Sequence, residues 1–233
     1  SGAIDDEQRI YVSIDWNKVP SGDRVAGYID VKADNGQSEH VLVSVFNPSS
    51  PSISEVDSAF IESNGYISIP ATKYYKKQDN KDFKISVIPN IGAEGESVQL
   101  GNPVAPQWYT NRRSAPYVEY RFYCFSQGPV DIYTYVLPTF TLSTDRGYAG
   151  HERTNIETHY GVMIDKDTRI LEASTSSFEY AQDWYDSVLR NCRINKTTLN
   201  VASPGWHTLR IIGGDAGTVL QKIALDFGGL KRS

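Results

Sequence analysis

The chain has 233 residues, of which 39% are hydrophobic and 22% are charged, and these proportions exclude an intrinsically disordered protein. Its length exceeds that of a common single domain of about 100 to 150 residues, so one large β-sandwich and a small unit joined to a larger one both fit. The net charge of −5 argues against a nucleic-acid partner, and no apolar run approaches the roughly 20 residues that span a membrane.

The first 52 residues are predicted to form a small β-meander and a linker. Residues 9–16 alternate Ile, Val, Ile and Trp with Arg, Tyr, Ser and Asp, a period of two that indicates a half-buried strand. Residues 27–32 and 40–46 follow as two more strands, and Asp34-Asn35-Gly36 suits the tight turn between them. The sequence NPSSPS at 47–52 is a linker by composition. Three strands make a thin unit, so we expect this part to be the tail of an upstream β domain.

Residues 53–233 are predicted to form a larger, jelly-roll-like β-sandwich. Turn residues separate its strand candidates, which are numerous enough for that fold. The candidates are residues 66–69, 117–125, 130–137, 159–164, 186–194, 198–201, 206–212 and 219–227. Residues 180–192 have a helical alternative, because their apolar side chains fall near one stripe of a helix. The fold class is therefore all-β, with this segment open between strand and helix.

The strand at 117–125 has two contrasting faces. The face that is predicted to enter the core consists of Val118, Tyr120, Phe122 and Cys124. The other face mixes aromatic and charged side chains, and a turn at 126–129 leads to a further strand that is expected to pair beside it. Aromatic rings with interleaved charges suit a sugar, which presents apolar C–H patches and hydroxyl groups. The candidate carbohydrate-binding residues are Tyr117, Glu119, Arg121, Tyr123, Tyr133 and Tyr135.

This mixed face has two competing interpretations. If it binds sugar, Arg121 is the group that grips a uronic carboxylate with two parallel hydrogen bonds. If it is structural, a loop, a neighbouring domain or a dimer partner covers it, as is usual for tyrosines on the outside of a sandwich. Sugar binding by the isolated chain separates the two interpretations.

A glycoside hydrolase needs two carboxylates that face each other across a cleft, about 5 to 9.5 Å apart. Carboxylates are plentiful but lie in no catalytic motif: Asp15, Glu119, Asp165, Asp167, Asp183, Asp186, Asp215 and Asp226. The triplet Asp165-Lys166-Asp167 has the composition of a hairpin turn. The histidines are scattered, at His40, His151, His159 and His207, and no Gly-x-Ser-x-Gly elbow accompanies them. No catalytic residue is therefore assigned.

The two cysteines, Cys124 and Cys192, lack a CxxC spacing, which argues against a zinc site. They form either one disulfide or two buried free thiols, and the free thiols are the simpler expectation. The sequon Asn195-Lys196-Thr197 is weak, because such triplets often arise by chance. The start, Ser1-Gly2-Ala3, lacks the charged and apolar regions of a signal peptide.

An ordered series of motifs runs through most of the chain. It comprises RIYVSIDW at 9–16, VPSG at 19–22, FIESNGYISI at 60–69, VEYRF at 118–122, PT at 138–139, VMID at 162–165, Trp184 with Val188 and Asn191, GWHTL at 205–209 and LQKIALDFGG at 220–229. This series resembles the C-terminal part of glycoside hydrolase family 115. The members of that family are xylan α-glucuronidases, which remove glucuronic acid or its 4-O-methyl form from xylan side chains.

The resemblance implies that the catalytic machinery lies upstream, in a barrel and an associated domain. It implies a non-catalytic accessory module that resembles carbohydrate-binding modules in fold and supports packing, dimerisation and polysaccharide engagement. The implied partners are the upstream catalytic domains, a second copy in a homodimer and a plant polysaccharide. The implied location is secreted, periplasmic or at the cell surface. The alternative is an autonomous carbohydrate-binding module for xylan or uronic-acid glycans, attached to a different enzyme.

The resemblance also raises the question of a structural calcium ion. The related modules of carbohydrate-binding families 6 and 35 hold Ca²⁺ through a Glu in their first strand, where this sequence has Pro70. Loss of one carboxylate makes the site doubtful even though Asp226 remains in the last strand, because Ca²⁺ prefers several hard oxygen ligands. No cofactor and no metal are therefore expected, and Pro70 suits a strand end or edge.

Overall fold

The computed structural model describes residues 9–81, 83–92, 94–100, 114–139, 158–172, 180–215 and 217–231. The chain divides into two compact units, Ser1–Glu55 and Val56–Ser233. Each unit is described by itself. No helix among the described residues is long and apolar enough to span a membrane.

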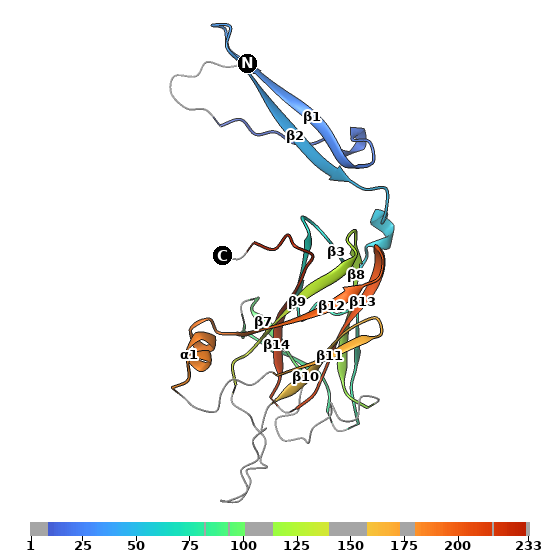
Figure 1. Cartoon of the computed structure of the whole chain (residues 1–233), viewed down its shortest axis with the longest axis vertical. Coiled ribbons are helices and arrows are strands. Elements are labelled where there is room, and N and C mark those ends of the chain that lie inside the picture. The colour runs from blue at the N-terminus through green and yellow to red at the C-terminus, as the bar shows by residue number, and fades with distance from the viewer. Residues whose placement is uncertain are drawn as a thin grey trace, which may run out of the picture. The chain divides into compact units, whose positions relative to one another are not determined.

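The first unit is an antiparallel hairpin of β1 (Gly22–Lys32) and β2 (Ser38–Asn47), which Figure 1 shows as two long paired strands. The turn between them follows from its sequence. Gly36 adopts a φ of 85°, and the Asn35 side chain accepts the N–H of Gln37 at 3.0 Å. The short 3-10 turns η1 (Trp16–Lys18) and η2 (Ile53–Glu55) flank the hairpin.

The strand predicted at residues 9–16 is wrong, so the meander has two strands and not three. Residues 9–15 form no ladder with another described segment, and Trp16 begins η1 instead. The Asp15 carboxylate accepts the N–H of Asn17 at 3.3 Å, which stabilises that turn. Alternation in a sequence describes the side-chain pattern of a strand, but a strand forms only where a partner pairs with its backbone.

The second unit is a sandwich of two six-stranded sheets. The first, called the β8 sheet, has the order β11 (Asp167–Glu172), β10 (His159–Ile164), β13 (Gly205–Ile212), β8 (Tyr117–Cys124) and β3 (Ala59–Ile61), with β5 (Lys76–Gln78) also paired to β8. The second, called the β9 sheet, has the order β12 (Arg193–Val201), β9 (Gly128–Val136), β14 (Val219–Asp226), β7 (Glu96–Gln99) and β6 (Ser86–Pro89), with β4 (Tyr66–Pro70) also paired to β14. All these pairs are antiparallel except β3 with β8. The all-β prediction is confirmed.

The core lies between the two sheets, and β8 supplies its centre. Val118, Tyr120, Phe122 and Cys124 are all fully buried, which confirms the face that was predicted to enter the core. The buried Tyr120 hydroxyl donates to the Ala71 carbonyl at 2.6 Å, so its polar tip is satisfied. Tyr160 from β10 contacts Thr134 from β9 through its hydroxyl, which connects the two sheets across the core.

The one α-helix of the described residues, α1 (Gln182–Leu189), lies where a strand at 186–194 was predicted. That prediction is wrong, and the helical alternative for residues 180–192 is the correct one. The helix ends at Leu189, Asn191 just beyond it has a left-handed φ of 53° that prevents its continuation, and β12 begins at Arg193. The Gln182 side chain donates to Asp186 one turn later at 2.8 Å, as helical spacing favours.

Candidate carbohydrate-binding surface

The outer face of the β8 sheet combines side chains from two neighbouring strands. The antiparallel register of β8 and β13 places Trp206 opposite Tyr123, Thr208 opposite Arg121, and Arg210 opposite Glu119. Alternate residues of a strand point to the same side, so these six side chains share the face that points away from the core. Two clusters form on it.

The first cluster, called the Glu119 network, is a buried charge pair. Glu119 is 4% exposed and accepts from the Arg210 guanidinium, with Nε at 2.8 Å, and from the Tyr75 hydroxyl. Arg210 also lies over the ring of Tyr117, 3.9 Å from its centroid. Every charge in this cluster therefore has a partner, and its role is structural.

The electrostatics of the Glu119 network follow from burial and hydrogen bonding. Burial raises the pKa of Glu119, but the hydrogen bonds from Tyr75 and Arg210 outweigh it, so the pKa lies below its ordinary value. Burial and the hydrogen bond to Glu119 raise the pKa of Tyr75 to about 12. Glu119 is therefore ionised and Tyr75 neutral at neutral pH.

The second cluster, called the aromatic platform, consists of Arg121, Tyr123, Phe125 and Trp206. The Arg121 guanidinium carbon lies 4.9 Å from the centroid of the Trp206 ring, a cation–π distance. Tyr123 meets Trp206 and Phe125 edge-to-face, with both pairs of centroids 5.2 Å apart. All four side chains are partly exposed, so solvent reaches the platform.

The two arginines of this face differ in one respect that decides their chemistry. Arg210 is neutralised by Glu119, whereas Arg121 forms no ion pair or hydrogen bond with any described residue. Its guanidinium carries five N–H donors, none of which is bonded to a described residue, and it lies beside the ring of Trp206. The platform thus presents a positive charge beside apolar ring surface.

The structure separates the six predicted site residues. Arg121 and Tyr123 lie on the platform, while Tyr117 and Glu119 are buried in the network, at 8% and 4% exposure. The residues of β9 do not join them, because β9 pairs with β12 and β14 in the other sheet. The expected pairing of the two strands is therefore wrong, and Tyr133 and Tyr135 lie on the outer face of the β9 sheet.

The outer face of the β9 sheet is held by its own polar contacts. Asp131 accepts from Lys196 at 2.6 Å and from Thr198 at 2.6 Å. Lys196 also approaches the ring of Tyr133, with its ammonium 5.8 Å from the centroid. The cation beside this tyrosine is thus already paired, unlike Arg121.

Four residues of the two clusters were not among the six sequence candidates: Tyr75, Phe125, Trp206 and Arg210. The alternation of Trp206, Thr208 and Arg210 marks them as one face of a strand. Which strand lies beside them is set by the fold, because β13 is distant from β8 in the chain.

The carboxylates and histidines outside this face have structural partners. Asp165 accepts from the His207 ring at 2.8 Å and from the N–H of Thr208 at 3.0 Å, which ties the β10–β11 turn. The predicted hairpin turn is confirmed by the φ of 51° at Asp165. The other carboxylates considered for catalysis pair with lysine, arginine, histidine or backbone N–H groups: Asp15, Asp167, Asp183, Asp186, Asp215 and Asp226. His151 lies outside the described residues.

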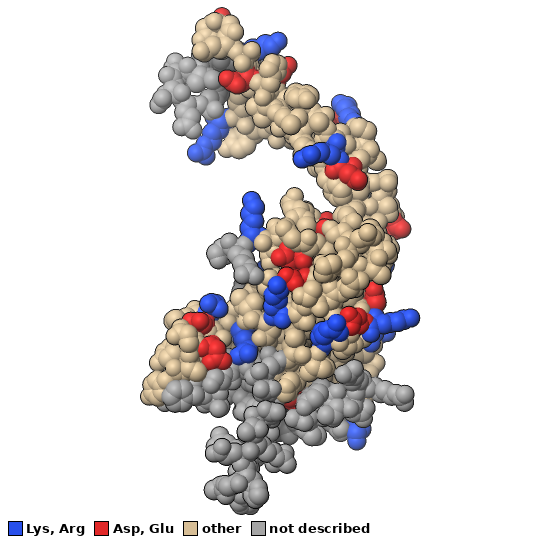
Figure 2. Space-filling view, viewed as in Figure 1, with Lys and Arg blue, Asp and Glu red and all other residues tan. Residues whose placement is uncertain are grey.

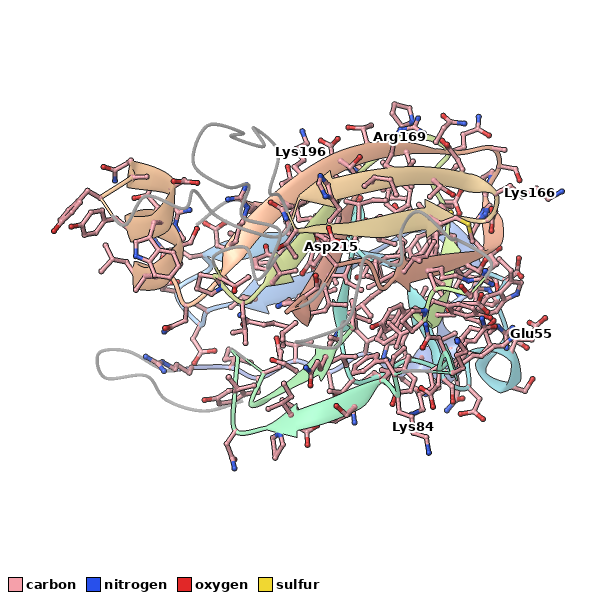
Figure 3. All side chains as sticks on the ribbon, turned by 90° about the horizontal axis from the view of Figure 1, so that it is seen from below. Glu55, Lys84, Lys166, Arg169, Lys196 and Asp215 are labelled. Atoms are coloured by element: carbon pink, nitrogen blue, oxygen red, sulfur yellow. The ribbon has the colours of Figure 1, made fainter. Side chains whose placement is uncertain are left out.

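Asp215 is the most buried of these carboxylates, and in Figure 3 it lies among the strands while Lys84 and Lys166 project outward. Its Oδ2 accepts the backbone N–H of His159 at 2.8 Å and contacts the His159 ring at 3.2 Å, while Oδ1 has no hydrogen-bond partner in the part of the chain that the structure describes. Burial raises the pKa of Asp215, and the hydrogen bonds from His159 offset only part of that effect.

Both cysteines are free thiols. Cys124 is fully buried and Cys192 is partly buried, which confirms the expected burial for Cys124. Burial raises the pKa of the Cys124 thiol to about 11, and burial also raises the pKa of Cys192. A raised pKa keeps a thiol protonated and unreactive at neutral pH.

The residues considered for calcium have other roles in this fold. Pro70 ends β4 opposite Lys222, and Asp226 accepts the N–H groups of Gly228 at 2.8 Å and Leu230 at 3.0 Å. The described residues contain no group of three or more His, Cys, Asp or Glu that is arranged to hold a metal ion. In Figure 2, acidic and basic side chains are interspersed on the visible face.

The chain was compared with curated proteins, solved structures and family models. No curated protein matches the chain. Among solved structures, a family GH115 4-O-methyl-α-glucuronidase with specificity for decorated arabinogalactans matches with 17% identity and a TM-score of 0.45, over 65% of this chain and 17% of that one. The C-terminal family 6 carbohydrate-binding module of a marine laminarinase from Zobellia galactanivorans matches with 14% identity and a TM-score of 0.42, over 69% of this chain and 98% of that one.

A family 35 carbohydrate-binding module from Clostridium thermocellum matches with 11% identity and a TM-score of 0.43, over 68% of this chain and 97% of that one. The chain thus spans about a sixth of the matched glucuronidase and nearly all of the two modules. The family model described as the glycosyl hydrolase family 115 C-terminal domain matches residues 59–233, which confirms the resemblance inferred from the motifs. The chain therefore belongs to the glycosyl hydrolase family 115 C-terminal domain family.

Proposed function

We propose that residues 56–233 are a non-catalytic accessory module of a xylan α-glucuronidase-like enzyme, and that the aromatic platform engages an acidic plant polysaccharide. The observation that carries this proposal is the guanidinium of Arg121, which lies over the ring of Trp206 and has no ion-pair or hydrogen-bond partner among the described residues. The family match and the partners of the described carboxylates support an accessory role.

The platform fits a sugar that carries a carboxylate. A pyranose presents apolar C–H groups, which suit the exposed ring surface of Tyr123 and Trp206. A uronic carboxylate offers two oxygens in one plane, which match two parallel N–H donors of Arg121. Because Trp206 already supports the guanidinium, little side-chain freedom is lost when the ligand binds.

A packing role remains the second candidate, and a specific neighbour of the platform favours it. Ile61 pairs opposite Tyr123 at the edge of the sheet and is 36% exposed, so the apolar surface extends beyond the platform. Such a surface also suits a catalytic domain of the same enzyme or a second copy in a homodimer. The alternative is an autonomous carbohydrate-binding module attached to a different enzyme. In such a module the platform would bind sugar and would not pack against another domain.

Calorimetry of the isolated chain with glucuronoxylan oligosaccharides, combined with sedimentation, separates these roles. A sugar-binding platform predicts measurable binding, and Tyr123→Ala weakens it by about thirtyfold, which corresponds to about 2 kcal/mol. A packing surface predicts no sugar binding, and Tyr123→Ala instead weakens association. Absence of binding by the unmodified chain contradicts the proposed sugar engagement. We expect a secreted, periplasmic or cell-surface location for the parent enzyme.

A further inference from the structure

The described part of the first unit, residues 9–55, has no core of its own. Among residues 9–55, none whose side chain the structure describes is buried. Ten of the eighteen large hydrophobic side chains that are exposed in the described residues lie in this unit, although it holds less than a quarter of the chain. A two-stranded hairpin is at best marginally stable in water, because it has nothing to cover its faces.

One face of the hairpin is aliphatic along its length. The register pairs Val25 with Val45 and Ile29 with Val41, and Gly27 lies opposite Val43 between them. Alternate residues share a face, so these side chains and Val31 form one surface, called the aliphatic face. No charged side chain interrupts it before Glu39, opposite Val31.

The opposite face of the hairpin is mixed. It carries the Asp30–His40 pair, with 2.5 Å between Oδ1 and Nδ1, and the exposed Ser44 opposite Ala26, and between them lie the exposed Tyr28 and Leu42, at 73% and 60% exposure. The unequal polarity of the two faces is typical of a strand pair that packs on one side and meets water on the other.

The backbone edges of the hairpin are open as well. β1 and β2 pair with each other and with no other described strand, so each leaves one row of N–H and C=O groups for another strand. The preceding segment, residues 10–16, has an alternating apolar pattern and forms no ladder, and the exposed fractions of Ile10 and Val12 are 66% and 60%. The sequence of this segment is typical of a strand, but the segment pairs with no described strand.

The size of the aliphatic face limits what can cover it. At about 3.3 Å per residue and 4.8 Å between strands, the face from Val25 to Val31 is about 20 Å long and about 10 Å wide, or roughly 200 Å². A stable interface between two proteins needs about 800 Å² per partner. A second copy of the hairpin is therefore too small a partner, whereas a segment joined to the hairpin covalently needs no such area.

We infer that the aliphatic face and open edges of the hairpin complete a β-sheet domain in the polypeptide that precedes the family 115 C-terminal domain in its parent enzyme. The family model begins at residue 59, after the hairpin, and the matched glucuronidase is a much longer chain than the part that resembles this one. The hairpin thus belongs to the domain before the sandwich and contributes two strands, or three with residues 10–16.

Cysteine labelling tests which face is covered. In a Cys192→Ser background, Val43→Cys places a thiol on the aliphatic face, and Ser44→Cys places a matched thiol on the mixed face. Both variants are made in this 233-residue chain and in the longer parent enzyme. We expect both thiols to react rapidly in this chain, and Val43→Cys alone to react at least about a hundredfold more slowly in the parent enzyme, because a buried thiol is shielded from the reagent.

The labelling rates of the two thiols distinguish the possible partners of the hairpin. Equal labelling of Val43→Cys in both proteins overturns it, and equal protection of both thiols in the parent enzyme overturns the assignment of the aliphatic face. Protection in this chain that grows with its concentration identifies a second copy as the partner instead. Amide exchange of β1 and β2 is an independent readout, with slowing expected only in the parent enzyme.

Discussion

Arg121 stacks on Trp206 across two neighbouring strands, 4.9 Å from guanidinium carbon to ring centroid, and has no acidic partner among the described residues. Arg210, two residues along the paired strand from the position opposite Arg121, is instead held by the buried Glu119. One sheet face thus carries a structural arginine and an available one.

Glu119→Gln is expected to destabilise the sandwich by about 3 kcal/mol, because it leaves the Arg210 charge without its partner in a buried site. Glu94→Gln, which removes the surface partner of Lys222, is the matched control and is expected to cost at most about 1 kcal/mol. Urea unfolding of the two variants measures the difference. If the two variants lose the same free energy of unfolding, Glu119 and Arg210 do not act as a buried charge pair.

The same network makes stability depend on pH. Because the pKa of Glu119 is lowered in the folded state, its ionised form stabilises the fold above the ordinary pKa of about 4.3. That contribution is lost as the pH falls through the folded pKa. We expect Glu119→Gln to flatten the fall of stability in acid, measured by thermal unfolding across that range, and an unchanged acid profile would contradict the assignment.

The thiols are expected to be unreactive in the folded chain and fully reactive after unfolding. Cys124 is buried with a pKa raised to about 11, so a thiol reagent at neutral pH should not modify it, and Cys192 should react slowly. Titration in denaturant should count two thiols per chain. A count of zero would indicate a disulfide and would contradict the structure.

Calcium is expected to have no effect on stability. Asp226 is occupied by two backbone N–H groups and Pro70 supplies no carboxylate, so no set of hard oxygen ligands is assembled there. Thermal unfolding in EDTA and in millimolar calcium should agree within about 1 °C. A filled site would add about 2.7 kcal/mol at a hundred times its Kd, which shifts the midpoint of a domain this size by several degrees.

The alternation of β8 could be predicted from its sequence, because its inward side chains are apolar and repeat with a period of two. The position of β9 could not. A turn after β8 normally joins two paired strands, but here the chain crosses to the other sheet at this corner. Glu62 holds the corner by accepting the N–H groups of Phe125 at 2.8 Å and Ser126 at 2.9 Å. This tie comes from a distant segment, so no local pattern reveals it.

The two wrong strand predictions have different physical causes. Residues 9–16 have the pattern of a strand but no partner among the described residues. In residues 186–194 two elements meet, because α1 ends at Leu189 and β12 begins at Arg193. Short apolar runs do not distinguish helix from strand without their tertiary partners.

The isolated chain is expected to release no glucuronic acid from aldouronic oligosaccharides. Glu119 is committed to Arg210 and Asp165 to His207, so neither is placed as a free acid or base. The assay measures free glucuronic acid with purified protein. Turnover that disappears on substitution of Glu119 or Asp165 would show that the chain is catalytic.

The most direct test of the platform compares Arg121→Gln with Arg169→Gln, an exposed arginine at the edge strand β11 that pairs with Asp167. Calorimetry measures both variants and the unmodified chain with glucuronoxylan oligosaccharides and with neutral xylan oligosaccharides of the same length. We expect Arg121→Gln to weaken binding of the acidic ligand by about tenfold or more, since a hydrogen bond to a charged group contributes about 1.5 to 3 kcal/mol, and to leave the neutral ligand unaffected. Arg169→Gln should match the unmodified chain with both ligands. Equal affinity of Arg121→Gln and the unmodified chain for the acidic ligand would contradict the role assigned to Arg121.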